Sequence, residues 1–141
     1  MERFVAFDIG DKRIGVAVSD PFNTYALPSE TYFRKGFAAD VAAIAQIAKQ
    51  KGATTIVCGL PVNFDGTQSV QTVKAQRFIE ELRRSTDIPV VCADERFTTM
   101  MAHETLISEG MSRQKRKNYV DALAAANILD GYLNAKNKKG D

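Results

Sequence analysis

The sequence predicts an α/β fold with a mixed five-stranded sheet, three antiparallel strands followed by two parallel ones, flanked by helices. In the first quarter of the chain, apolar stretches are separated only by short polar turns, which is typical of antiparallel strands. After that, short apolar runs alternate with segments whose apolar residues recur at helical spacing, which indicates parallel strands joined by helices. The length of 141 residues predicts one domain over residues 1–135, followed by a flexible basic tail at 136–141.

The first strands are predicted at residues 3–9, 13–19 and about 24–33. Pro28 interrupts the third stretch, so this strand is expected at the edge of the sheet, where a missing N–H is tolerated. A helix is expected to follow, because apolar residues recur at helical spacing up to Gly52, which ends it.

The rest of the chain is expected to alternate between strand and helix. The predicted elements are a buried strand at 54–60, a helix that follows the loop at 61–69 and runs to about Arg84, a buried strand at 88–93, a helix that Thr98 or Thr99 begins and Gly110 ends, and a last helix that Ser112 begins and that ends near Asn134.

Composition excludes several classes of protein. The net charge of +2 is small, so a site for a polyanion has to come from a local patch of basic residues. No apolar run approaches the roughly 20 residues that span a bilayer, and no membrane association is expected. Cys58 and Cys92 both lie in apolar runs, which predicts buried thiols and a reducing, cytoplasmic location.

Asp8 is the carboxylate that interrupts the first apolar strand. Burying a carboxylate without a partner costs several kcal/mol, so Asp8 is expected either to face a metal or a phosphate or simply to cap the following turn. Gly10 and Gly15 carry no side chain, which would let a ligand or another backbone come close.

Two further acidic positions have a comparable setting. Asp94-Glu95 comes directly after an apolar strand, and Asp121 lies in an alanine-rich helix that could sit close to the sheet. Convergent carboxylates suit Mg²⁺ or Mn²⁺, and two such ions about 4 Å apart hold a phosphodiester for attack by water. The alternatives are an N-cap or loop position for Asp94-Glu95 and a solvated helix face for Asp121. This chemistry needs no histidine nucleophile, and His103 is expected to be a helix residue.

Four ordered blocks carry a resemblance over nearly the whole chain. The chain resembles the YqgF family of pre-16S rRNA nucleases, relatives of bacterial Holliday-junction resolvases with an RNase H-like fold. The blocks are Phe7-Asp8-Ile9-Gly10 with Arg13-Ile14-Gly15-Val16-Ala17, Gly59-Leu60-Pro61 with Asn63 and Gly66, Asp94-Glu95-Arg96 with Thr98-Thr99, and Asp121-Ala122-Leu123-Ala124-Ala125 with Ile128-Leu129.

The resemblance implies a nuclease that uses Mg²⁺ or Mn²⁺ and processes the 5′ end of precursor 16S rRNA in ribosome biogenesis. It implies that Asp8, Glu95 and Asp121 are the metal-binding catalytic acids. Glu95 is preferred as the third acid, although Asn63 and Asp65 in the loop after the fourth strand are alternatives.

Polar residues near these acids are expected to bind the nucleic acid. Each has a plainer interpretation as a surface ion pair, a turn residue or a solvated basic face. The candidates are Arg13, Asn63, Arg96, Thr98, Lys115, Arg116 and Lys117. Because no RNP-like aromatic pattern is present, recognition through shape and backbone is expected.

Three other functions remain open at this point. A resolvase for branched DNA would work as a symmetric dimer, and the chain is expected to be a monomer or a homodimer. A non-catalytic nucleic-acid-binding factor in transcription would keep the basic run without needing three acids. An ATP-binding module of the actin and sugar-kinase type would need two lobes, and this chain supplies one.

Overall fold

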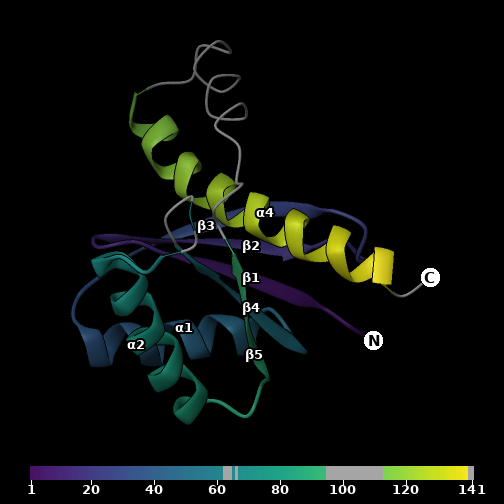
Figure 1. Ribbon diagram of the computed structural model, residues 1–141. Coiled ribbons are helices and arrows are strands. Elements are labelled where there is room, and N and C mark those ends of the chain that lie inside the picture. The colour runs from purple at the N-terminus through teal and green to yellow at the C-terminus, as the bar shows by residue number, and fades with distance from the viewer. Residues whose placement is uncertain (62–64, 66, 95–112, 140–141) are drawn as a thin grey trace.

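The computed structural model describes residues 1–61, 65, 67–94 and 113–139, and within the last of these ranges the side chains of residues 119–137. Five strands form one sheet in the order β3-β2-β1-β4-β5 (Figure 1). They are β1 (Phe4–Ile9), β2 (Arg13–Ser19), β3 (Ala26–Phe33), β4 (Thr55–Leu60) and β5 (Val90–Asp94). The first three strands pair antiparallel, whereas β4 is parallel to β1 and β5 is parallel to β4. The predicted mixed sheet is therefore confirmed.

Helices cover both faces of this sheet. The described helices are α1 (Phe37–Gln50), α2 (Val70–Ser85) and α4 (Arg113–Lys139). α1 and α2 lie on one face, and α4 crosses the other (Figure 1). α4 continues to Lys139, past the end predicted near Asn134. The helix predicted to end at Gly110 lies outside the described residues.

The pleat of β1 divides the core into two clusters, because successive side chains of a strand point to opposite faces. Val5 and Phe7 pack with apolar residues of α1 and α2, whereas Phe4 and Ala6 pack with Ile128 and its neighbours on α4. All of these side chains are at most 3% exposed. Position 8 continues the second series, so the pleat assigns Asp8 to the α4 face.

The two edges of the sheet explain one correct and one wrong prediction. Pro28 lies on β3, the edge strand, and pairs with Ala17 where the β2–β3 register shifts. Its predicted edge position is confirmed. Cys58 on β4 is buried as predicted, but Cys92 is exposed, because β5 is the other edge strand and has a neighbour on one side only. Within the described part of the chain, no helix is both long and apolar enough to cross a membrane.

Candidate active site

The backbone of α4 rests directly on β2 at Gly15. A Cβ atom added to Gly15 would lie 1.8 Å from the carbonyl oxygen of Asp121 and 2.3 Å from its carbonyl carbon. One turn further along α4, Ala125 and Ala126 pack against Ala17 of β2. Two expectations are thereby confirmed: the alanines let this helix sit close to the sheet, and Gly15 lets another backbone approach.

Asp8 is the residue paired with Gly15 across the antiparallel β1–β2 ladder. Residues directly opposite each other share a face, with Cβ positions about 5 Å apart. Since α4 crosses that face with Asp121 against Gly15, the fold brings Asp8 and Asp121 to the same place from the two ends of the sequence. The register and the helix contact thus put two of the three predicted acids on one face of the sheet.

Arg13 pairs with one of these acids. Its Nε atom lies 2.7 Å from Oδ2 of Asp121, and the two side chains are 29% and 21% exposed. The sequence predicts nucleic-acid binding for Arg13 and gives no local sign of this ion pair. The reason is that Arg13 lies on β2, two residues from Gly15 and on the same face, so it reaches Asp121 only because α4 packs there.

The Oδ2 atom of Asp121 is buried and accepts no hydrogen bond from the residues that the structure describes. The Arg13 guanidinium therefore offsets the negative charge of this oxygen without forming a hydrogen bond to it. A buried carboxylate oxygen with unused lone pairs is unfavourable unless a further positive partner occupies the site. This oxygen belongs to the helix that crosses the face of the sheet carrying Asp8, and it fits a hard divalent cation.

The third acid cannot be placed in the same way. The described residues contain no group of three His, Cys, Asp or Glu side chains arranged to hold a metal ion. Glu95 lies outside the described residues. Asp94 shares the side of β5 with Val90, which packs toward α1 and α2, so the pleat puts Asp94 on the face opposite Asp8. Asp65 is exposed and accepts hydrogen bonds from Thr67 in its own loop.

The predicted nucleic-acid contacts fall mostly on parts of the chain that the structure leaves undescribed. Asn63, Arg96 and Thr98 lie outside the described residues. The backbone of residues 115–117 belongs to the first turns of α4, which lead into Asp121, while the side chains of Lys115, Arg116 and Lys117 are not among those described.

Asp40 is a buried acid that the sequence analysis did not single out. It is 1% exposed and accepts hydrogen bonds from Nε of Arg34 at 2.8 Å, from the Tyr32 hydroxyl at 3.0 Å and from the backbone N–H of Lys35 at 2.8 Å. Burial alone would raise the pKa of Asp40, but these hydrogen bonds together hold it below its usual value. Its position in the first turn of α1, shortly after the basic pair Arg34-Lys35, is the signal that could have revealed it.

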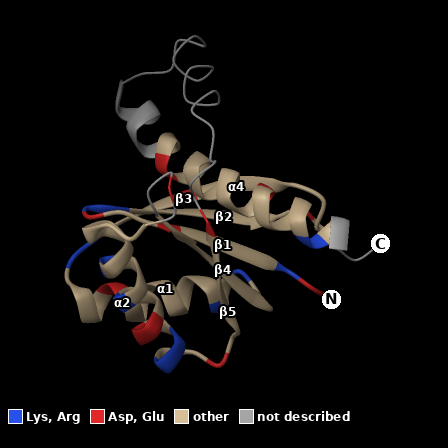
Figure 2. Ribbon diagram, viewed as in Figure 1, with Lys and Arg blue, Asp and Glu red and all other residues tan. Residues whose placement is uncertain are grey.

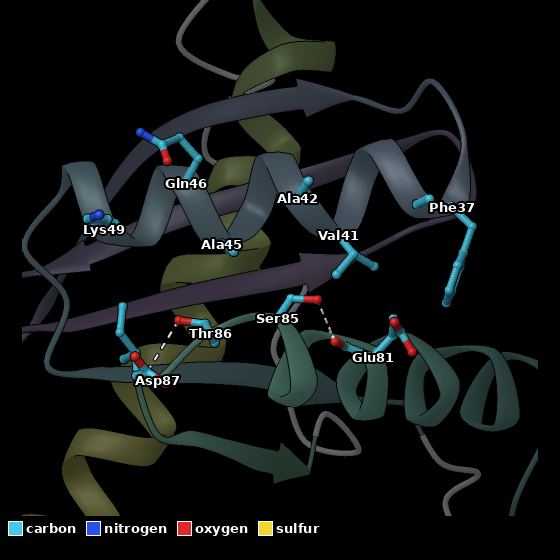
Figure 3. A pocket seen from close by; sticks show the side chains of 12 residues that line it. Phe37, Val41, Ala42, Ala45, Gln46, Lys49, Glu81, Ser85, Thr86 and Asp87 are labelled. Carbon is cyan, nitrogen blue, oxygen red and sulfur yellow. Dashed lines mark hydrogen bonds between the residues drawn. The ribbon is translucent and has the colours of Figure 1, made fainter.

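A hollow of about 590 Å³ lies between α1 and α2. Phe37 and Val41 of α1 face Glu81 and Ser85 of α2 across it (Figure 3). The hydroxyl of Ser85 donates to the carbonyl oxygen of Glu81 at 2.9 Å, so it is already engaged within its own helix. This hollow lies on the opposite face of the sheet from Asp8 and Asp121 and is separate from the candidate active site.

Comparisons with known proteins point to one family. The RuvX family, described as Holliday junction resolvase, matches residues 2–135. A protein of Caldanaerobacter subterraneus subsp. tengcongensis is 46% identical over 136 residues, covering 95% of this chain and 97% of the relative. A protein of Clostridium acetobutylicum is 39% identical over 133 residues, covering 94% and 98%. Both carry the name "Putative pre-16S rRNA nuclease".

Solved structures share the fold at low sequence identity. Thermus thermophilus RuvC in complex with a Holliday junction substrate matches with a TM-score of 0.60 and 13% identity, covering 96% of both chains. The fowlpox virus resolvase in complex with Holliday junction DNA matches with a TM-score of 0.58 and 12% identity, covering 94% of this chain and 97% of that chain. The RNase H-like fold expected from the sequence is confirmed, and the match over residues 2–135 shows that this chain belongs to the RuvX family.

Proposed function

We propose that this protein is a divalent-metal-dependent nuclease that trims precursor 16S rRNA in the cytoplasm during ribosome biogenesis. Its family and the nuclease names of its relatives make it a hydrolase of phosphodiester bonds. The rRNA substrate is the finer part of the proposal and is supported by the names of relatives that match nearly its full length. Two cysteines without a disulfide suit a reducing compartment.

One observation supports the site above all others. The buried Oδ2 of Asp121 accepts no hydrogen bond from the described residues, and the backbone of Asp121 lies against Gly15, the cross-strand partner of Asp8. The Arg13 guanidinium offsets the charge of that oxygen, but no described residue donates a hydrogen bond to it, so its lone pairs remain available to a metal ion. We assign Asp8 and Asp121 as metal ligands and propose Glu95 as the third, because Val91 and Ala93 of β5 pack on the α4 face and Glu95 continues that series in the sequence.

The chain's own residues have distinct roles in this proposal. Asp8, Asp121 and Glu95 would hold Mg²⁺ or Mn²⁺, which lowers the pKa of a bound water and stabilises charge on the leaving oxygen. Arg13 offsets part of the charge of the Asp121 carboxylate and carries a positive charge toward the scissile phosphate. We propose that Lys115, Arg116, Lys117, Asn63, Arg96 and Thr98 contact the nucleic-acid backbone near this site.

A second candidate is cleavage of branched DNA. The family description favours it, and the same acids would perform the same hydrolysis on a four-way junction. Symmetric cleavage of a junction needs two active sites, so this candidate also requires a homodimer, whereas end trimming of RNA works with a monomer.

The test is a cleavage assay with the full chain and Mn²⁺. The two probes are a labelled precursor 16S rRNA 5′ fragment and a four-way DNA junction. We expect cleavage of the RNA, and Asp8→Asn should abolish it while leaving the melting temperature and circular dichroism spectrum unchanged. Full activity of Asp8→Asn would remove Asp8 from the catalytic site. Cleavage of the junction alone would select the DNA function.

A further inference from the structure

A second polar hollow lies at the same end of the central strand β1 as Asp8, but on the face covered by α1 and α2. Its volume is about 420 Å³. Four connected parts of the fold form it: the β1–β2 turn, the β3–α1 connection, the first turn of α1 and α2. Its charged lining consists of Asp11, Arg34, Lys35, Asp40, Lys74 and Arg77, and we refer to it as the basic pocket.

The basic pocket is tied to the end of the strand that carries Asp8. Nη1 of Arg34 donates to the carbonyl oxygen of Gly10 at 2.9 Å, and Gly10 follows β1 directly. Asp11, the next residue, lies 3.5 Å from Nζ of Lys74 on α2. A nucleic-acid strand held at Asp8 and Asp121 therefore needs only to pass over the β1–β2 turn to reach this pocket.

The two acids of the pocket pair with only two of its four cations. Asp40 is buried and accepts from Arg34 and the backbone, so it serves to hold the β3–α1 connection in place. The pair of Asp11 and Lys74 has side chains 57% and 59% exposed, and exposed pairs at this separation are weak. An incoming anion can therefore compete with Asp11 for Lys74.

Two cations of the pocket have no acidic partner. Within the described residues, no Asp or Glu oxygen lies within ion-pair distance of Lys35 or Arg77. Instead the Arg77 guanidinium lies over the Phe37 ring, 5.4 Å from its centre, which holds it at the rim. The connection from β3 to α1, which carries Arg34 and Lys35, is coloured blue in Figure 2. Cationic side chains that line a concave surface and have no acidic partner are suited to binding a phosphate group.

We propose that the basic pocket binds a backbone phosphate of the substrate away from the scissile bond, with Lys35 and Arg77 as its main contacts. The inference rests on the proposed nuclease function and adds where the strand runs: from the metal site on the α4 face, over the β1–β2 turn, to the α1–α2 face. Phosphate contacts of this kind position the strand without reading its sequence.

The test is the double variant Lys35→Gln/Arg77→Gln. Its matched control is Lys49→Gln/Arg84→Gln, which removes the same charge near the far ends of α1 and α2. Binding of the precursor 16S rRNA fragment is measured by fluorescence anisotropy in the Asp8→Asn background, at several salt concentrations. Cleavage is measured with Asp8 intact, and inorganic phosphate is added as a competitor.

We expect Kd to rise about tenfold in the pocket variant and its logarithmic salt slope to flatten by roughly one to two, as when one or two phosphate contacts are lost. KM should rise while kcat stays unchanged, and the control should match the unmodified chain. Equal Kd, salt slope and KM in pocket and control variants would overturn this proposal even if the chain cleaves RNA. An absence of cleavage by the unmodified chain would instead count against the proposed function, while the binding comparison would still decide the pocket.

Discussion

Replacing Gly15 with alanine tests whether the contact between β2 and α4 builds the active site. The added Cβ would lie 1.8 Å from the carbonyl oxygen of Asp121, whereas real Cβ contacts are essentially never shorter than 3.0 Å. The obstacle is backbone, so no side-chain rotation relieves it. α4 must move away from β2 by about 1.2 Å, the difference between these distances.

Such a movement has separate consequences for stability and for metal binding. Overpacking of this kind costs about 1–3 kcal/mol, which a domain of this size tolerates. Metal ligands, however, keep their distances to within about 0.2 Å, so a shift of about 1.2 Å at Asp121 takes it out of reach of a cation held by Asp8. We therefore expect Gly15→Ala to fold, to bind Mn²⁺ weakly in calorimetry and to cleave RNA about a hundredfold more slowly.

Gly131→Ala is the matched control, because it adds the same methyl group to the same helix. Nothing lies within 4 Å of its added Cβ. Its unfolding free energy should rise by about 0.5–1 kcal/mol, since alanine favours the helix interior, and its cleavage rate should not change. A Gly15→Ala protein with unaltered Mn²⁺ affinity and cleavage rate would refute the idea that this contact positions Asp121.

Two further predictions concern the charged networks. Arg13→Gln removes a positive charge beside Asp121, so calorimetry at low salt should show Mn²⁺ affinity rising several-fold. Arg13→Lys keeps the charge and should leave the Mn²⁺ affinity unchanged. Weaker Mn²⁺ binding by Arg13→Gln would contradict this prediction and would mean that the guanidinium is needed to orient the carboxylate. The lowered pKa of Asp40 means that its contribution to folding is present above its unfolded pKa, near 3.8, and is lost as the pH falls through its folded pKa. Asp40→Asn should lower the unfolding free energy at pH 7 by about 3 kcal/mol. The urea midpoint of the variant should then decrease less between about pH 4 and lower pH than that of the unmodified chain. The same decrease in both proteins would contradict this role of Asp40.

The candidate site was partly readable from the sequence. Asp8 could be singled out because a charge in an apolar strand is locally anomalous, and Asp121 because it sits among alanines. Neither signal contains the geometry that joins them. That geometry depends on the pairing of Asp8 with Gly15 and on the contact of Gly15 with α4. The residues around either acid do not predict which glycine the helix packs against.

The sequence by itself determined the order and type of the described elements, the edge position of the strand with Pro28 and the close approach of the alanine-rich helix. These follow from local properties: the period of apolar residues, a missing N–H and small side chains. Only the tertiary structure decided the ion pair of Arg13 with Asp121, the burial of Asp40 and the exposure of Cys92. Each of these depends on which strand or helix lies beside a residue, and packing between distant segments sets that only when the whole chain folds.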